Sequence, residues 1–396
     1  MTNAIKPCSN CTGCSACSVA CPTGAMSIIC DDEGFYRYNV DYTKCVNCRL
    51  CYEVCPNHSD EVSDYVCDFD QRYYAARNID EEVVCSSSSG GMFAAFSKAI
   101  ISDGGSVYGV VINYPTCSIE YKRATTLEET YPMRGSKYIQ AKLSNNIIEM
   151  LIEDINNNIP VLFTGTSCYV NGIRRLLKLK KISAENVVFM DFICAGVISN
   201  KLWMKNVGYY TQKIGTLKKI SFRDKRYGWR DSCISWESDN TMCKTKYALS
   251  EVGLFQSVYE ALGRSCNECK YRSFLHPGDI TVGDFWNEQY LPRKWWDDKG
   301  VSMLMVNTLK GSELLEKCKD NLEVMDVQKN MVFSSSFELL KSVINEKKRE
   351  ELFSDADRMD FVLFKQKWLK CSFKDKILLG IVRPIFLRLG VHRYKK

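Results

Sequence analysis

The chain has 396 residues, more than a single hydrophobic core usually supports, so we expect two or three domains. Hydrophobic residues make up 45% and charged residues 25%, which is the composition of an ordinary globular protein and excludes wholesale disorder. The formal net charge of +6 is modest for this length and does not by itself indicate a nucleic-acid partner.

Cysteine is the unusual component, because ten of the 21 cysteines lie within the first 55 residues. The opening residues 1–6 contain no apolar signal segment, so we expect a reducing, cytoplasmic compartment. In such a compartment clustered thiols indicate metal ligands rather than disulfides.

Residues 11–22 and 45–56 both have the pattern C-x2-C-x2-C-x3-C-P. In this pattern three close thiolates bind one [4Fe–4S] cluster and the fourth reaches the other cluster. Cys11, Cys14, Cys17 and Cys55 would hold one cluster, and Cys45, Cys48, Cys51 and Cys21 the second. Two short strands around residues 31–34 should form a hairpin between the runs. The alternative is a pair of zinc sites, whose cysteines usually come in separated pairs. We assign residues 1–62 to a ferredoxin-like domain and 63–79 to an acidic linker.

The following residues, 80–375, alternate between apolar runs and helical periodicity. The expected elements are a helix at 92–100, a strand at 106–112, a helix at 147–155, a strand at 160–163, a helix at 170–177, and strands at 187–193 and 279–282. Strand, helix and strand in this order predict parallel pairing of the strands at 160–163 and 187–193. The fold class is therefore α+β: a ferredoxin-like domain, then an α/β domain with a mixed, partly parallel sheet.

Two further cysteines, Cys168 and Cys194, follow the ends of these two parallel strands, at the edge where open sheets bind ligands. The pair Cys266 and Cys269 precedes the last expected strand. The four thiols could converge on a third cluster, although a cysteine is also commonly a small core residue and a lone C-x2-C can be structural zinc.

Other familiar signatures are missing: no G-x-G-x-x-G, Walker A or H-E-x-x-H motif occurs. We expect none of the three histidines, His58, His276 and His392, to lie beside a candidate nucleophile, which disfavours histidine-based hydrolysis.

Seven short motifs make the large domain resemble the beta-subunit family of coenzyme F420 hydrogenases and dehydrogenases. They lie at residues 87–91 (SSSGG), 135–138 (GSKY), 163–168 (FTGTSC), 194–196 (CAG), 224–229 (DKRYGW), 266–269 (CNEC) and 278–286 (GDITVGDFW). The resemblance implies a [4Fe–4S] cluster on Cys168, Cys194, Cys266 and Cys269 that exchanges electrons with FAD. The family's Thr-Pro-Cys step is Thr166-Ser167-Cys168 here, a departure that leaves the cysteine in place.

Candidate flavin contacts are Ser88, Ser89, Gly90, Gly91, Lys137 and Thr166. Residues 86–91 resemble a helix N-terminus, whose free amides favour phosphate, although an ordinary helix cap has the same pattern. Lys137 could stabilise an anionic flavin or substrate; the alternative is a solvated surface lysine. The catalytic residues cannot be assigned.

The resulting hypothesis is an oxidoreductase in which a ferredoxin-type donor or acceptor, the clusters and FAD act on an organic substrate. Because similar two-cluster members occur beside genes for surface-polysaccharide synthesis, a sugar-linked substrate is one expectation. The rivals are an electron-transfer adaptor that serves a separate catalytic partner and a zinc-stabilised scaffold. Residues 376–396 form a basic amphipathic tail that either contacts the inner membrane face peripherally or packs on the large domain.

Overall fold

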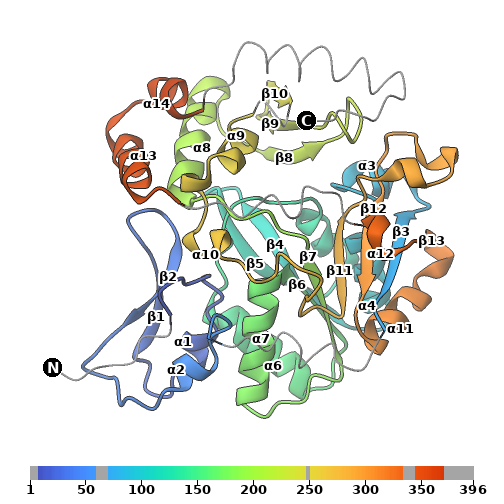
Figure 1. Cartoon of the computed structure of the whole chain (residues 1–396), viewed down its shortest axis with the longest axis horizontal. Helices are drawn as coiled ribbons and strands as arrows, with labels where there is room; N and C mark the ends of the chain where they lie inside the picture. Colours follow the sequence, from blue (N-terminus) through green and yellow to red (C-terminus); the bar gives the residue numbers. More distant parts are fainter. Residues whose placement is uncertain (1–7, 59–69, 247–249, 333–343, 370–396) are drawn as a thin grey trace.

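The computed structural model describes residues 8–58, 70–246, 250–332 and 344–369. Its first part contains two short helices, α1 (Ala16–Ala20) and α2 (Leu50–Glu53), and an antiparallel hairpin of β1 (Met26–Cys30) and β2 (Tyr36–Val40). The hairpin lies between the two cysteine runs, as the sequence predicted. This part is the blue region in Figure 1.

The two cysteine runs have the same backbone conformation. A left-handed residue precedes the second cysteine of each run, Gly13 (φ 79°) and Asn47 (φ 55°). Another follows that cysteine, Ser15 (φ 61°) and Arg49 (φ 66°). Left-handed residues reverse the local direction of the chain, so each run curls before it enters α1 or α2.

The large domain is built around an eight-stranded mixed sheet (Figure 1). Its strands, in spatial order, are β13 (Leu322–Asp326), β3 (Arg72–Asn78), β12 (Ser302–Val306), β11 (Ile280–Asp284), β7 (Val187–Phe192), β6 (Val161–Thr166), β4 (Ser106–Asn113) and β5 (Ser118–Ala124). The four neighbours β11, β7, β6 and β4 are parallel, and the remaining pairs are antiparallel. The expected fold class and the parallel pairing of β6 with β7 are confirmed.

Helices cover both faces of this sheet because its parallel strands are apolar on both sides. Val161 and Phe163 of β6 belong to the core that includes α6 (Asn145–Asn156) and α7 (Ser167–Leu179). Leu162, between them, belongs to the core on the other face. That face is covered by α4 (Met92–Ser102) and α11 (Leu309–Lys317).

Shorter helices connect the elements around this sheet. They are α3 (Glu81–Ser86), α5 (Leu127–Thr130), α10 (Arg264–Asn267) and α12 (Lys329–Val332). A second region has a three-stranded antiparallel sheet of β8 (Lys219–Asp224), β9 (Cys233–Glu237) and β10 (Met242–Lys246). Its helices are α8 (Asn200–Ile214), α9 (Glu251–Ser257), α13 (Glu346–Arg358) and α14 (Phe361–Trp368). Its core contains the stacked pair Trp203 and Trp236, with ring centroids 5.3 Å apart.

The acidic linker expected at residues 63–79 requires a correction. Residues 72–78 form β3, which pairs with both β12 and β13 inside the large sheet. Ala75 and Ala76 are both fully buried, so this strand lacks the alternation of apolar and polar residues that identifies a strand in a sequence. Residues 63–69 lie outside the described residues, and the large domain begins with β3 rather than at residue 80.

The ferredoxin-like part is held against the large domain by buried polar contacts. The Gln140 side chain donates to the Thr12 carbonyl at 2.9 Å and accepts from the Tyr36 amide at 2.6 Å. Ser18 Oγ donates to Asn145 Oδ1 at 2.6 Å. Because Gln140 is only 3% exposed, loss of these contacts would leave buried polar groups unpaired.

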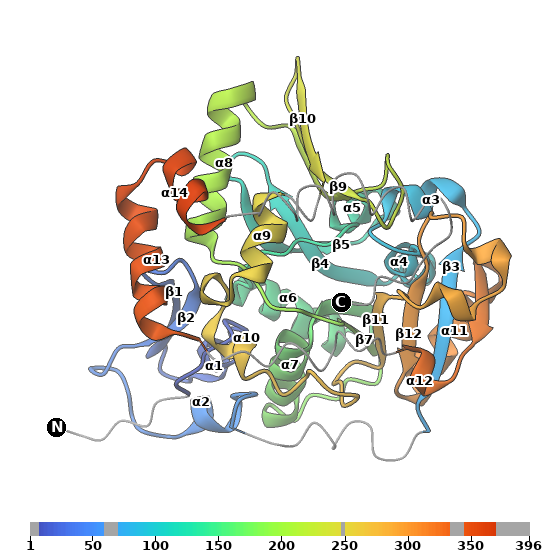
Figure 2. The ribbon, with the colours of Figure 1, turned by 45° about the horizontal axis from the view of Figure 1, so that its top comes forward.

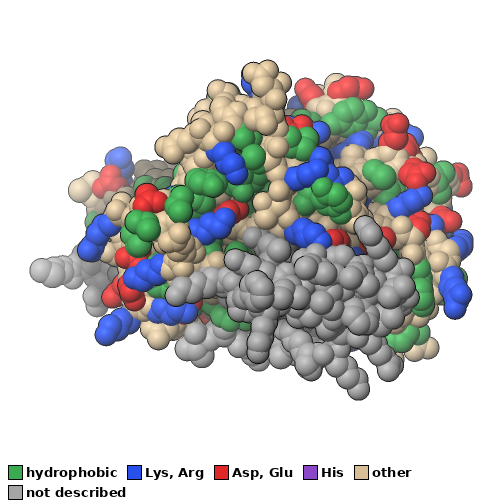
Figure 3. Space-filling model, turned by 90° about the horizontal axis from the view of Figure 1, so that it is seen from above, with side chains coloured by type: hydrophobic (Ala, Val, Ile, Leu, Met, Phe, Trp, Pro, Cys, Tyr) green, Lys and Arg blue, Asp and Glu red, His purple; other side chains and the backbone are tan. Residues whose placement is uncertain are grey.

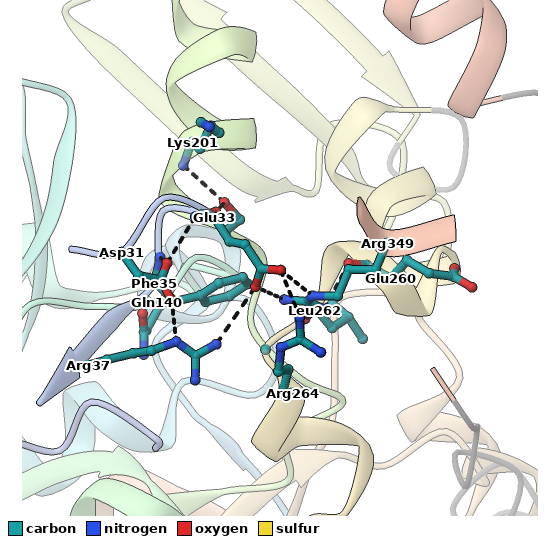
Figure 4. A network of polar contacts seen from close by, with 12 residues as sticks. Asp31, Glu33, Phe35, Arg37, Gln140, Lys201, Glu260, Leu262, Arg264 and Arg349 are labelled. Carbon is teal, nitrogen blue, oxygen red and sulfur yellow. Dashed lines mark hydrogen bonds and ion pairs between the residues drawn. The ribbon is translucent and has the colours of Figure 1, made fainter. Parts of the chain in front are cut away.

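The hairpin turn that carries Glu33 is fixed by arginines (Figure 4). Arg349 of α13 is fully buried and places Nη2 2.7 Å from Glu33 Oε2. Arg264, at the start of α10, places Nη2 3.0 Å from Glu33 Oε1. Arg349 also donates to the carbonyls of Glu260 and Leu262. One carboxylate therefore links the ferredoxin-like hairpin to α13 and to the segment that leads to Cys266.

The face seen in Figure 3 carries Lys and Arg side chains interspersed with acidic and hydrophobic ones. Within the described ranges, no helix has both the length and the apolar character that crossing a bilayer requires. The basic amphipathic tail expected at residues 376–396 lies outside the described residues.

Candidate metal centre and its surroundings

The eight front cysteines form the two groups that the spacing predicted. Cys21, Cys45, Cys48 and Cys51 line one small cavity. In the other group, burial raises the pKa of the Cys17 thiol, and the nearby Cys14, Cys11 and Cys55 thiols raise it further, with a smaller effect from Cys51 of the first group. The fourth cysteine of each group thus comes from the opposite run.

The groups differ in exposure. Cys48 is exposed and Cys45 half-buried, whereas Cys14, Cys17 and Cys55 are buried against the large domain. Cys8, which precedes the first run, is also buried beside Cys11 and Cys55.

The large domain brings its four candidate cysteines together. Cys168, Cys194, Cys266 and Cys269 line a cavity of about 430 Å³, whose wall also includes Cys8, Asn10 and Asn57 from the front of the chain. Burial raises the pKa of the Cys168 thiol far above its usual range, and the other three thiols are close enough to raise it further. The ferredoxin-like part therefore closes one side of this cavity.

Strand order explains the convergence. The parallel strands β6 and β7 end at the same edge of the sheet. Cys168 lies in the first turn of α7, directly after β6, and Cys194 follows β7. Cys266 lies in α10, and Cys269 follows that helix; Figure 2 shows α10, α1 and α7 close together. The sequence predicted the shared edge of Cys168 and Cys194, and the long connection through β8–β10 returns the chain to it.

Across the described residues, no three His, Cys, Asp or Glu side chains have the arrangement that one metal ion requires. A [4Fe–4S] cube binds one thiolate at each of its four corners, so its ligands lie farther apart than those around one ion.

The surroundings of the cavity favour an anionic occupant. The N-terminus of α7, at residues 166–169, forms part of the wall, and its dipole stabilises negative charge. Arg272 lines the same cavity, and its Nε, Nη1 and Nη2 are buried without a hydrogen-bond partner among the described residues. A buried guanidinium without partners is costly, and a tetra-thiolate cluster would supply the missing negative charge. The residues present fit the cluster that the resemblance implies.

Four of the candidate flavin contacts, residues 88–91, lie outside the wall of the cysteine cavity, and we call them the Ser-Gly segment. Ser88 Oγ accepts from the Ser136 amide at 2.7 Å, and Ser89 Oγ donates to the Val301 carbonyl at 2.8 Å. The Gly90 amide donates to Ser302 Oγ, and a Cβ at Gly90 would lie 2.4 Å from the Ala76 carbonyl oxygen. Gly91 (φ 86°) precedes α4. The Ser-Gly segment is thus at a helix N-terminus, as predicted, but it also packs tightly on β3 and β12.

Lys137 has a different role from the expected one. Its ammonium donates to the carbonyls of Pro132, Met133 and Arg134 at 2.9, 2.9 and 3.0 Å. Burial lowers the pKa of Lys137 to about 7, and the three carbonyl oxygens oppose that shift by favouring the charged form. Because these bonds use all three ammonium protons, Lys137 stabilises the segment before it and has no proton left for a flavin or substrate. Thr166 instead lies at the cysteine site, with Oγ1 3.2 Å from Cys168 Sγ.

Several motif segments meet in a second group, which we call the aromatic–basic cluster: Tyr138, Arg223, Trp229, Asp284 and Trp286. Arg223 Nη1 lies 3.1 Å from Asp284 Oδ2 and 3.3 Å from the Tyr138 hydroxyl. Trp229 stacks on Trp286 with ring centroids 4.6 Å apart, and Trp286 is 39% exposed. Asp284 ends β11, the parallel neighbour of β7, so this cluster and Cys194 lie at the same edge of the sheet.

One expectation about histidine was wrong. His276 Nδ1 lies 3.1 Å from Ser167 Oγ and 3.0 Å from Asp191 Oδ2. In a hydrolytic triad the two ring nitrogens serve the serine and the carboxylate separately, whereas here one nitrogen faces both. His276 is 1% exposed. The three residues form a buried polar contact at the N-terminus of α7, and the geometry does not support hydrolysis.

Sequence reasoning missed Arg272 and Arg223. Arg272 follows Cys269 by three positions, but nothing in the sequence distinguishes it from a surface arginine. Arg223 immediately precedes the DKRYGW motif, and that position was its only signal.

Two protein families match separate parts of the chain. Residues 160–330 match the family described as the C terminus of the coenzyme F420 hydrogenase/dehydrogenase beta subunit. Residues 10–59 match the 4Fe–4S dicluster domain.

Individual relatives are distant. One subunit of the F(420)H(2) dehydrogenase of Methanosarcina mazei is 21% identical over 54% of this chain and 60% of its own length. An uncharacterized ferredoxin of Methanocaldococcus jannaschii is 38% identical over 12% of this chain and 62% of its own length. This chain therefore spans less than two thirds of either relative.

Among solved structures, one chain of the F420-reducing [NiFe] hydrogenase complex from Methanosarcina barkeri aligns with a TM-score of 0.48 and 16% identity. The alignment covers 72% of this chain and 90% of the other. The two family matches, to the 4Fe–4S dicluster domain at residues 10–59 and to the C terminus of the coenzyme F420 hydrogenase/dehydrogenase beta subunit at residues 160–330, agree with the resemblance read from the sequence.

Proposed function

We propose that the chain is an iron–sulfur flavoprotein oxidoreductase that carries electrons between a ferredoxin-type partner and an organic substrate. The observation that carries the proposal is the cavity in which Cys168, Cys194, Cys266 and Cys269 meet beside the buried group of front cysteines. Clusters supply single electrons and a flavin converts them to pairs, which is the chemistry that most organic reductions need.

The exposure of the cysteines supports an order for the three sites. The group containing Cys45 and Cys48 is nearest to solvent and would meet the partner. The group containing Cys14 is buried against α7: a Cβ at Gly172 of that helix would lie 2.6 Å from Cys14 Sγ. Cys168 lies one turn earlier in the same helix. Tyr169 and Tyr271 line the cavity beside Cys168. Burial raises the pKa of both hydroxyls, and the Cys168 and Cys14 thiols raise it further.

For the flavin we propose the aromatic–basic cluster together with the Ser-Gly segment, without Lys137, whose ammonium is bonded to backbone carbonyls. The half-exposed Trp286 ring offers a surface for a planar ring, and Arg223 lies 5.5 Å from its centroid. The N-terminus of α4 favours phosphate. Ser88 of the Ser-Gly segment accepts a hydrogen bond from Ser136, which is two positions before Tyr138 of the aromatic–basic cluster. The segment and the cluster are therefore neighbours.

The second candidate is an electron-transfer adaptor that binds no organic substrate. It is favoured by the M. mazei relative, which is named as one subunit of a dehydrogenase. A partner protein would then take the place of the substrate. The two candidates do not depend on whether coenzyme F420 is used, on the direction of electron flow or on whether the substrate is linked to a sugar.

Anaerobic purification followed by flavin and iron quantification separates these functions. The proposal predicts bound flavin that bleaches when a reduced ferredoxin-type donor is added. Cluster iron without flavin would overturn it in favour of the adaptor. A colourless protein that holds zinc would contradict both.

A further inference from the structure

Arg272 is a cation without a counter-charge beside the cysteine cavity. All three guanidinium nitrogens are buried, and none has a hydrogen-bond partner among the described residues. Burial raises the pKa of the Cys194, Cys266 and Cys269 thiols, and Arg272 opposes this shift at each one. The guanidinium therefore lies within electrostatic range of three of the four thiols.

Other charged groups near the cavity already have partners. Lys270 donates to the Pro56 carbonyl at 2.6 Å. Glu268 accepts from the Asn10 amide. The Glu268 carboxylate forms no ion pair with Arg272 among the described residues, so it does not neutralise the positive charge of Arg272.

The bases near Cys11 and Cys55 of the front clusters have partners among the described residues. Arg37 is near Cys11, but it pairs with Asp31 and lies 3.8 Å from Glu33. Arg175, near Cys55, donates to the Glu53 carbonyl. The base near Cys11 is thus offset by carboxylates, whereas Arg272 has none.

We propose that Arg272 is the charge partner of the cluster held by Cys168, Cys194, Cys266 and Cys269, and that it raises the reduction potential of this cluster relative to the front pair. Each reduction adds one negative charge to a cluster, and an adjacent buried cation stabilises the reduced form more than the oxidised form. The charge therefore favours electron flow from the front of the chain toward the large domain. This inference rests on the third cluster of the proposed function.

The test is an anaerobic redox titration of the full-length chain, monitored by electron paramagnetic resonance. Arg272→Gln removes the charge at similar size, and Arg272→Lys retains the charge. The matched control is Arg77→Gln. Arg77 lies on β3, pairs with Glu323 and Asp297, and is not among the residues that line the cavity.

We expect Arg272→Gln to retain about twelve irons, the content of three four-iron clusters, and to move one midpoint to lower potential. The other two midpoints and the Arg77→Gln control should match the parent. Unchanged midpoints in Arg272→Gln would overturn the inference.

Loss of the third cluster in Arg272→Gln is also informative. Recovery of the cluster in Arg272→Lys would support a need for the charge, and its loss in both variants would contradict the inference. A parent chain with only about eight irons would refute the third cluster itself, a separate failure.

Discussion

At the scale of single residues, Arg349 is the clearest case of a side chain that one interaction places. It is fully buried, with its guanidinium on Glu33 and on two carbonyls. Removing one partner of a buried ion pair costs about 3–5 kcal/mol, because the remaining charge loses its compensation. Glu33 is partly exposed and retains Arg264, so the lower part of that range applies.

We therefore predict that Arg349→Met destabilises the chain by about 3 kcal/mol. Anaerobic thermal scans at one heating rate would measure this as a lower unfolding midpoint. The control is Arg226→Met, because Arg226 is at the surface and its pair with Asp224 should contribute about 1 kcal/mol or less. Equal shifts for the two variants would mean that the Glu33 contact does not fix the hairpin.

Single residues also show which parts of the site the sequence could predict and which it could not. The spacing of the eight front cysteines predicts two ligand groups because a C-x2-C-x2-C-x3-C-P run fixes its own local geometry, and this assignment stays a prediction. Lys137 and Arg272 were misjudged or missed because the partner of a long basic side chain depends on which carbonyls or thiols the fold brings near it. No local pattern records that.

At the scale of elements, α7 connects the two cysteine sites. It carries Cys168 in its first turn and Gly172 one turn later, against Cys14. Glycine normally weakens a helix interior by about 1 kcal/mol, so a helical glycine in close contact indicates a packing requirement.

We predict that Gly172→Ala displaces Cys14 and lowers the iron content from about twelve to about eight per chain. The added Cβ would lie 2.6 Å from Cys14 Sγ and 3.0 Å from Cys14 Cβ, closer than packed atoms allow. The matched control is Gly208→Ala in α8, where a Cβ meets nothing within 4 Å. That variant should keep its iron. If both variants retain the parent's iron and spectra, α7 does not press on the front cluster.

Helices and strands were predictable from the sequence where one spacing of apolar residues, helical or alternating, dominates. The hairpin, α4, α6, α7, β4, β6, β7 and β11 follow apolar patterns that show in the sequence. β3 was assigned to a linker because acids precede it and both of its faces are buried. The β8–β10 sheet was missed because its central strand β9 is buried along nearly its whole length, so it lacks the alternation of apolar and polar residues that identifies a strand in a sequence.

At the scale of the whole molecule, buried contacts fix the ferredoxin-like part on the large domain. Its buried cysteine group faces α7, its hairpin is held by Glu33, and Gln140 joins it to the large domain. The parallel order of β6, β7 and β11 places Cys168, Cys194 and Asp284 at one edge of the sheet. The sequence indicated this edge for the two cysteines, but the return of Cys266 and Cys269 to it depends on tertiary structure.

The central claim is that Cys168, Cys194, Cys266 and Cys269 hold a third cluster, and iron content in Cys269→Ala tests it most directly. After anaerobic reconstitution we expect about twelve irons per parent chain and about eight in the variant, because the front clusters have separate ligands. The control, Cys30→Ala, alters an exposed cysteine outside all three groups and should retain about twelve irons. An iron content in Cys269→Ala equal to that of the parent would contradict the account.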